Sequence, residues 1–149
     1  FLPGTDQIVT SSDDQSVRIW NATSGQFLRS FEHEKWVRGM DVSPDGKWIA
    51  SSALGDVVRL TDASTLETIY DLPGHGRVGG QRCVAFTPDS KRFASFGDEP
   101  YLRVWDVATG VALLEEEIKP GGQPLKGHDG EREFRSPGRE ATVRRRHLR

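Results

Sequence analysis

Short apolar runs alternate with turn-forming residues along most of the chain. The runs are rich in β-branched and aromatic residues and too short for core helices, and Pro-Asp-Gly or Pro-Asp-Ser turns separate them. This pattern predicts β-strands and no helix. Where the pattern is best preserved, it predicts four strands near residues 39–42, 48–52, 57–60 and 67–70.

The pattern repeats about every forty residues. The stretch 42–51 recurs at 86–95, offset by 44 residues, and more loosely at 1–10, offset by 41. A second set of matching runs occupies 16–21, 57–62 and 101–106 with the same two offsets. A fixed period of this size is typical of repeat architectures in which each unit is one small sheet. We therefore divide the chain into three units, at about 1–32, 33–74 and 75–126.

The ends of each unit resemble the WD-repeat, or G-beta repeat, family of β-propellers. Gly74-His75 leads to Trp105-Asp106, His33 leads to Thr61-Asp62, and Gly127-His128 opens a further unit. The resemblance covers roughly residues 1–128, and the amino-acid sequences of the turns are closer to those of bacterial members. It implies an all-β fold, a partial and open propeller of consecutive four-stranded antiparallel blades. We interpret the chain as a fragment of a larger propeller.

The resemblance also implies a hydrogen-bonded network inside each blade, which joins a loop His, a Ser or Thr, a turn Asp and a Trp. Carried over by position, it assigns Ser12, Asp14 and Trp20 in the first unit. In the second unit it assigns His33, with Ala53, Gly55 and Thr61 at the other places. In the third it assigns His75, Gly97, Glu99 and Trp105. No unit would then hold a full network, so we expect the blades to have low stability.

The third run of each unit carries an arginine between apolar neighbours, at Arg18, Arg59 and Arg103. Such a side chain can lay its stem over a strand while its guanidinium reaches water. We expect Trp20 and Trp105, two residues further on, to be buried against the adjacent blade.

Composition excludes several classes of function. Twenty basic residues against 22 acidic ones leave a net charge of −2, which gives no basis for nucleic-acid or membrane binding as the main activity. No apolar run reaches the length of a membrane helix, and one cysteine cannot form an internal disulfide. We expect a soluble chain without membrane contact, and of the possible compartments we favour the cytoplasm.

Catalysis and metal binding are also disfavoured. Three of the four histidines occupy the repeat's loop position, one per blade, and the fourth, His147, has no partner at ligand spacing. The acidic pairs 13–14 and 98–99 sit in tight turns, where Asp suits the backbone. We therefore expect no enzyme activity, no metal and no cofactor.

The last part of the chain, 127–149, lacks the repeat and is rich in arginine. Either it is a natural basic extension or the reading frame was lost after Gly127-His128; we favour the second. In both cases we expect an unstructured tail.

With catalysis and metal binding disfavoured, the exposed surface is the remaining candidate for a functional site. We expect a non-catalytic scaffold that binds other proteins, with Trp36, Lys35 and Arg77 on the binding rim. The alternative is a regulatory or substrate-binding module of a larger bacterial enzyme, such as a protein kinase or a redox protein. Nucleic acid is an unlikely partner. Because the terminal units have uncovered faces and edges, we also expect the chain to self-associate.

Overall fold

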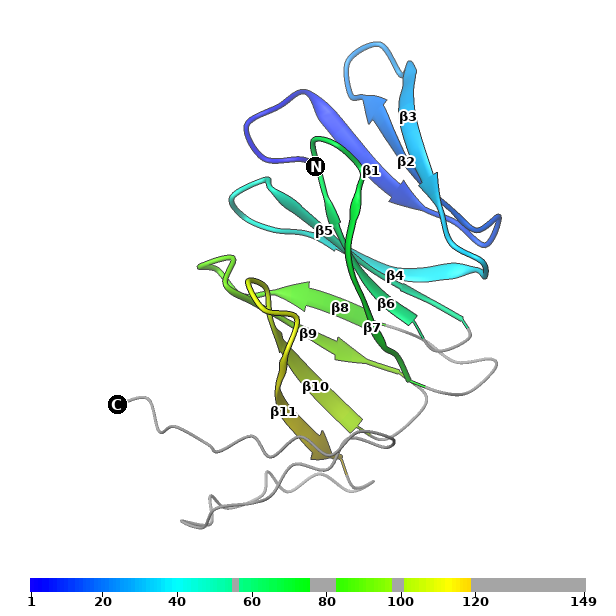
Figure 1. Ribbon diagram of the computed structural model, residues 1–149. Coiled ribbons are helices and arrows are strands. Elements are labelled where there is room, and N and C mark those ends of the chain that lie inside the picture. The colour runs from blue at the N-terminus through cyan, green and yellow to red at the C-terminus, as the bar shows by residue number, and fades with distance from the viewer. Residues whose placement is uncertain (55–56, 76–82, 98–100, 119–149) are drawn as a thin grey trace.

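The computed structural model describes residues 1–54, 57–75, 83–97 and 101–118 of the 149-residue chain. This part consists of β-strands and turns, and it contains no helix. The strands form three separate antiparallel sheets, each built from a continuous part of the chain (Figure 1). The all-β prediction is confirmed.

We call the three sheets blades 1, 2 and 3. Blade 1 has three strands, β1 (Gln7–Ser11), β2 (Ser16–Asn21) and β3 (Phe27–Glu32). Blade 2 has four, β4 (Val37–Val42), β5 (Trp48–Ala53), β6 (Val57–Asp62) and β7 (Thr68–Pro73). Blade 3 also has four, β8 (Cys83–Phe86), β9 (Arg92–Phe96), β10 (Tyr101–Asp106) and β11 (Ala112–Glu117). In every blade the strands lie in chain order.

The turn between the first two strands of blade 2 shows why the Pro-Asp-Gly sequence recurs. The Ser43 hydroxyl donates to the Asp45 carboxylate at 2.6 Å and accepts from the Trp48 amide at 2.9 Å. Gly46 completes the turn with a φ of +73°, a conformation that glycine adopts without strain. In blade 3 Thr87 and Asp89 make the corresponding bond at 2.6 Å.

The last strand pair of each blade carries an irregularity at one place. The register shifts between Ile19 and Trp20, between Leu60 and Thr61, and between Val104 and Trp105. The last residue of β2, β6 and β10, which is Asn21, Asp62 or Asp106, caps the next turn by accepting backbone N–H bonds. The repeat therefore extends from sequence to hydrogen-bond register.

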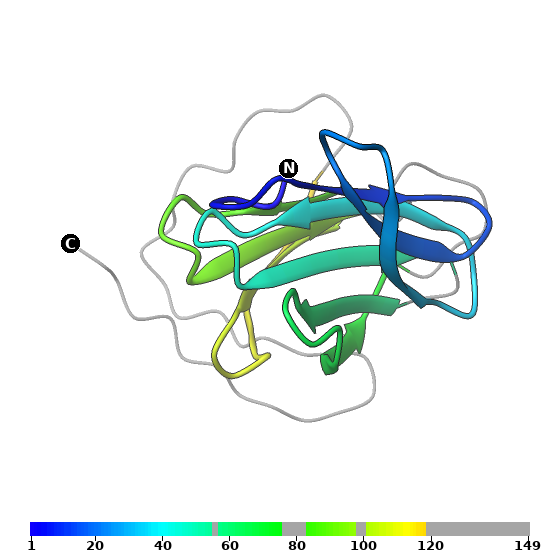
Figure 2. The same cartoon turned by 90° about the horizontal axis from the view of Figure 1, so that it is seen from above.

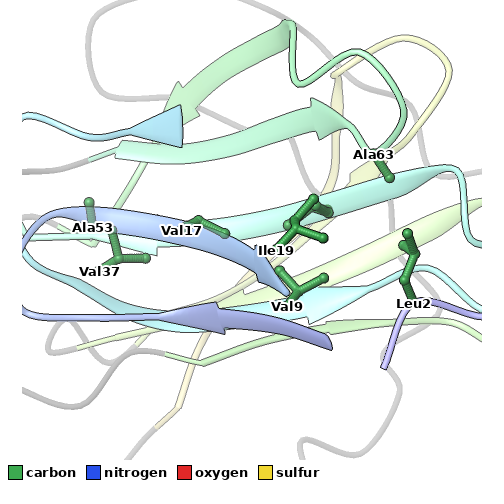
Figure 3. Close-up of a cluster of buried hydrophobic side chains, with 8 residues drawn as sticks. Leu2, Val9, Val17, Ile19, Val37, Ala53 and Ala63 are labelled. Atoms are coloured by element: carbon green, nitrogen blue, oxygen red, sulfur yellow. The ribbon is translucent and has the colours of Figure 1, made fainter. Parts of the chain in front are cut away.

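The blades stack face to face, with one apolar core in each of the two spaces between them. The first core joins blades 1 and 2 (Figure 3) and includes Leu2, Val9, Val17, Ile19, Val37, Ile49, Ala53 and Ala63. The second joins blades 2 and 3 and includes Ala50, Val58, Leu60, Leu72, Val84, Phe93, Trp105 and Val107. Blade 2 is thus covered on both faces.

Blades 1 and 3 lie at opposite ends of the stack, and the sheets overlap in the view from above (Figures 1 and 2). The array does not close into a ring. The predicted partial, open propeller is therefore confirmed. The tail predicted at 127–149 lies outside the described residues. In the part that is described, no helix has the length and apolar character needed to span a membrane.

Candidate protein-interaction site

The interior of blade 3 joins His75 and Trp105 through one serine. The Trp105 Nε1 donates to the Ser95 Oγ at 2.8 Å, and the His75 Nε2 lies 2.9 Å from the same oxygen. All three residues are buried. The sequence-based assignment of Gly97 to this position is wrong by two residues. Gly97 instead lies against the histidine, where an added Cβ would come within 2.4 Å of the His75 Cβ.

Blade 2 keeps half of this arrangement. The His33 Nε2 lies 2.8 Å from the Ser51 Oγ, so the serine position is filled and the assignment of Ala53 to it is wrong. Thr61 stands where the other blades have tryptophan. Its hydroxyl and that of Ser52 are buried without a hydrogen-bond partner among the described residues. Gly55 lies outside those residues.

In blade 1 the tryptophan's partner is Thr10. The Trp20 Nε1 donates to the Thr10 Oγ1 at 2.9 Å, which again is two residues before the predicted Ser12. Trp20 is only half-buried, contrary to expectation, because no described sheet covers this face of blade 1. The signal for the correct assignment was present, because the offsets of 41 and 44 align Thr10 with Ser51 and Ser95.

Asp14 and Ser12 organise the tight turn of blade 1. The Asp14 carboxylate accepts from the Ser16 hydroxyl at 2.6 Å and from the Ser16 amide, and it pairs with Arg18. These hydrogen bonds, led by the Ser16 hydroxyl, lower the pKa of Asp14 to about 2. The Ser12 hydroxyl accepts from the Asp14 amide at 3.2 Å. The equivalent Glu99 of blade 3 lies outside the described residues.

An arginine clamp recurs in blades 2 and 3. Arg59 binds the carboxylate of Asp71, directly opposite on β7, at 2.7 Å and donates to the Glu32 carbonyl. Arg103 binds Glu115, opposite on β11, at 2.9 Å and donates to the carbonyl of Gly74. Each clamp therefore holds the residue that comes directly before the loop histidine. In blade 1 the residue opposite Arg18 is Ser30, which cannot form an ion pair.

The guanidinium group of Arg103 does not reach water, contrary to the expectation from the sequence. Arg103 is buried, with the acid of its ion pair also mostly covered. Its NH1 group lies 3.2 Å from the His75 Nδ1. A guanidinium can only donate, so this bond requires a histidine whose Nδ1 accepts and whose Nε2 donates to Ser95.

His33 is held neutral by its surroundings. Burial lowers the pKa of His33 to about 4; the positive charge of Arg59 adds to this, and Asp71 acts in the opposite direction. A buried neutral histidine bonded to a serine has a structural use. It is not poised to exchange protons at neutral pH.

The predicted binding rim contains one exposed aromatic platform, made by Trp36, Arg38 and Asp13. Trp36 lies just before β4 and is 46 % exposed. The Arg38 guanidinium lies 5.2 Å from the centre of its ring and pairs with both carboxylate oxygens of Asp13, at 3.2 and 3.3 Å. Lys35 is also exposed. Arg77, the third predicted residue, lies outside the described part of the chain.

Backbone bonds on both sides hold the platform in place. The Leu54 amide donates to the Trp36 carbonyl at 2.9 Å, and the Val37 amide donates to the Ser12 carbonyl at 3.1 Å. The indole is therefore presented on a fixed backbone by two blades at once. A rigid aromatic with a planar donor beside it is the chemistry that protein interfaces use at their centres.

Other chemistries find little support in the described ranges. No group of three His, Cys, Asp or Glu side chains there is close enough to hold a metal ion. The two described histidines, His33 and His75, lie in blade interiors.

Stacked antiparallel blades, two of them four-stranded and one with a His–Ser–Trp interior, define a propeller-type repeat protein. The chain belongs to the WD domain, G-beta repeat family, whose model matches residues 1–21, 25–62 and 66–106.

Among individual proteins, the chain is 28 % identical over 110 residues to Actin-interacting protein 1 of Drosophila melanogaster, covering 73 % of this chain and 18 % of that protein. It is 27 % identical over 138 residues to the Target of rapamycin complex subunit wat1 of Schizosaccharomyces pombe, covering 92 % and 44 %. It is 29 % identical over 125 residues to the Small ribosomal subunit protein RACK1y of Oryza sativa subsp. japonica, covering 83 % and 35 %. The chain thus spans less than half the length of each.

These relatives come from an insect, a yeast and a plant. The expected bacterial character of the sequence is therefore not supported.

Proposed function

We propose that this chain is a non-catalytic interaction module that binds another protein through the platform of Trp36, Arg38 and Asp13. The observation that carries the proposal is the half-exposed indole, fixed by an arginine that is itself fixed by a carboxylate. An aromatic side chain that is already immobilised loses little conformational entropy on binding. The Arg38 guanidinium keeps donors that a partner's carboxylate or carbonyl can use.

The relatives support the same class of function. Their names describe one protein that interacts with actin, one subunit of a complex and one protein of the small ribosomal subunit. None of these partners is carried over to this chain, because each similarity covers less than half of the relative. What is carried over is attachment to another protein.

The test compares the proteins that the full chain and two variants retain from an extract of the organism of origin. Trp36→Ala removes the platform, while Ile69→Ala removes a similarly exposed apolar side chain on β7. We expect Trp36→Ala to reduce recovery of a specific partner at least tenfold and Ile69→Ala to leave it unchanged. Equal recovery by Trp36→Ala and the unaltered chain would contradict the proposal.

A further inference from the structure

Each blade has two faces, and the same sequence positions form each face in every blade. The face toward the preceding blade is made in blade 2 by Ile49, Ser51 and Thr61 and in blade 3 by Phe93, Ser95 and Trp105. All six residues are buried. The face toward the following blade is made in blade 1 by Val9, Val17 and Ile19 and in blade 2 by Ala50, Val58 and Leu60, again all buried.

At the two ends of the stack, no other described sheet covers the same two faces. On blade 1 the positions equivalent to Ile49, Ser51 and Thr61 are Ile8, Thr10 and Trp20, and none of them is buried. On blade 3 the positions equivalent to Ala50, Val58 and Leu60 are Ala94, Leu102 and Val104, which are half-buried. Blade 1 therefore exposes the kind of face that meets a preceding blade inside the molecule. Blade 3 exposes the kind of face that meets a following blade there.

A polar latch accompanies each internal contact between blades. Arg29, opposite Ile19, donates to the carbonyls of Ala63 and Ser64 in the turn of blade 2, at 3.0 and 2.5 Å. Tyr70, opposite Leu60, donates through its hydroxyl to the Ala108 carbonyl in the turn of blade 3, at 2.9 Å. These two residues occupy equivalent positions on the outermost strands, and both acceptors are main-chain carbonyls in the turn after the third strand.

The equivalent of Arg29 and Tyr70 on blade 3 is Leu114, opposite Val104. Leucine has no donor, so the end of the stack carries the apolar face without the latch. The turn that would supply the acceptor on blade 1 is the one at Ala22 and Thr23, which directly follows β2.

We propose that the following face of blade 3 docks on the preceding face of blade 1 in a second copy of this chain. Two copies related by a twofold axis would make two identical contacts of this kind and join their six described blades in one ring. Closed propellers have roughly four to eight blades, so two copies fall within the range and three exceed it. The contact is head-to-tail, and closure prevents the open-ended growth that such contacts otherwise produce.

A second copy is the occupant because the match is with the chain's own surfaces. The two internal interfaces already show which side chains fit this face, and the two open faces reproduce them position by position. Trp20 is prepared for such a contact, since Thr10 already satisfies its Nε1 and the edge of Phe27 packs on its ring at a centroid distance of 5.6 Å. Covering it would bury carbon and leave no orphaned donor.

The first experiment measures the mass of the full 149-residue chain by analytical ultracentrifugation from low to high micromolar concentration. We expect a reversible equilibrium between one and two copies. A chain that stays monomeric at high micromolar concentration would overturn the proposal. Open-ended growth without a discrete two-copy species would overturn it as well.

The second experiment separates head-to-tail docking from other pairings. Ile8→Glu places a charge on the open face of blade 1, and Leu102→Glu places one on the open face of blade 3. We expect each variant alone to be monomeric, and an equimolar mixture to form a mixed pair through the two unaltered faces. If either variant alone still forms the two-copy species, head-to-tail docking is wrong.

The third experiment adds the missing latch and does not depend on a destabilising change. Leu114→Tyr supplies the donor found at the equivalent Tyr70, whereas Leu113→Tyr, at the neighbouring exposed position, does not. We expect Leu114→Tyr to tighten self-association by about fivefold per contact, the effect of one added hydrogen bond. No tightening, or equal tightening by Leu113→Tyr, would show that blade 3 does not dock on blade 1 in this register.

Discussion

A single hydroxyl position determines how firmly each blade holds its central side chains. In blade 3 the Ser95 Oγ contacts both His75 and Trp105, in blade 2 the Ser51 Oγ contacts only His33 among these side chains, and in blade 1 Thr10 receives Trp20. Where threonine replaces tryptophan, at Thr61, a buried hydroxyl has no hydrogen-bond partner in the part of the chain that the structure describes. The blades therefore differ in stability through single side chains.

Trp20 on β2 and Trp105 on β10 occupy equivalent positions and give a matched comparison. Trp105 is buried in the second core, while Trp20 is half-buried on an open face. Trp105→Ala should lower the free energy of unfolding by about 3 to 5 kcal/mol, and Trp20→Ala by less than about 2 kcal/mol, because only the first leaves a cavity in a packed core. Urea titration at one fixed protein concentration measures both values. Equal losses would mean that blade 1 is covered.

His33 makes stability depend on pH. Its pKa is about 4 in the folded protein and near 6.5 when the chain unfolds, so the unfolded state binds the proton first as pH falls. The stability due to neutral His33 is therefore present above pH 6.5 and is lost progressively between pH 6.5 and 4. The full loss is roughly 3 kcal/mol.

The measurement compares the unaltered chain with His33→Gln, which does not titrate. We expect the difference in unfolding free energy between the two proteins to shrink as pH falls from 7 to 4. Only the unaltered chain is destabilised when the His33 of its unfolded state binds a proton. Low-pKa carboxylates such as Asp14 affect both proteins equally and cancel in the difference. A difference that is constant with pH would show that His33 stays accessible to protons.

At the scale of the elements, the third and fourth strands of a blade are joined by an ion pair whose value depends on burial. Arg103 and Glu115 are 6 % and 14 % exposed at their side chains, whereas Arg59 and Asp71 are 18 % and 48 % exposed. A buried charge that loses its partner is costly, while an exposed pair contributes little. The same pattern of residues thus has different consequences in blades 2 and 3.

Removing one arginine at a time measures this difference. Arg103→Leu should destabilise the protein by about 3 to 5 kcal/mol, because it leaves Glu115 in a poorly hydrated place. Arg59→Leu should cost about 1 kcal/mol or less, because Asp71 can be hydrated. Adding Glu115→Leu to the first variant should recover part of the loss, because the Gly74 carbonyl and the His75 Nδ1 still lack their donor. If the double variant is no more stable than Arg103→Leu, the ion pair is not the cause.

The elements themselves were largely predictable. Alternating apolar runs and Pro-Asp-Gly turns placed all four strands of blade 2 within about three residues of their bounds. The serine position was missed by two residues, which keeps a side chain on the same face of a strand and so leaves the polarity pattern unchanged. The burial of Arg103 could not be inferred from its own run, because it depends on Glu115, whose place opposite is set after the register shift.

At the scale of the whole molecule, stability comes from contacts between successive blades. The two cores are both interfaces, and blade 2 contributes to both. β1 occupies the place in blade 1 that β5 and β9 occupy in the other blades. β5 pairs with β4 and β9 pairs with β8, but no described strand pairs with the corresponding edge of β1. Local opening should therefore begin at blade 1.

Hydrogen exchange tests this order of opening. Amides of β1 should exchange at least tenfold faster on average than those of β5, because β1 has a free edge and a half-covered face. β5 is the suitable control because it occupies the same place in its blade and is covered on both sides. Equal protection of the two strands would show that blade 1 opens only together with blade 2.

The latches made by Arg29 and Tyr70 have a consequence for how such a chain can diverge. Both end on main-chain carbonyls, which every residue supplies, so the turn that receives the latch can change its side chains without losing the bond. The donor can also change, since a guanidinium and a phenol serve equally at this position. Neighbouring repeats can therefore drift in sequence independently, and a repeat taken from another chain could be grafted beside an existing one without co-adapting its turn.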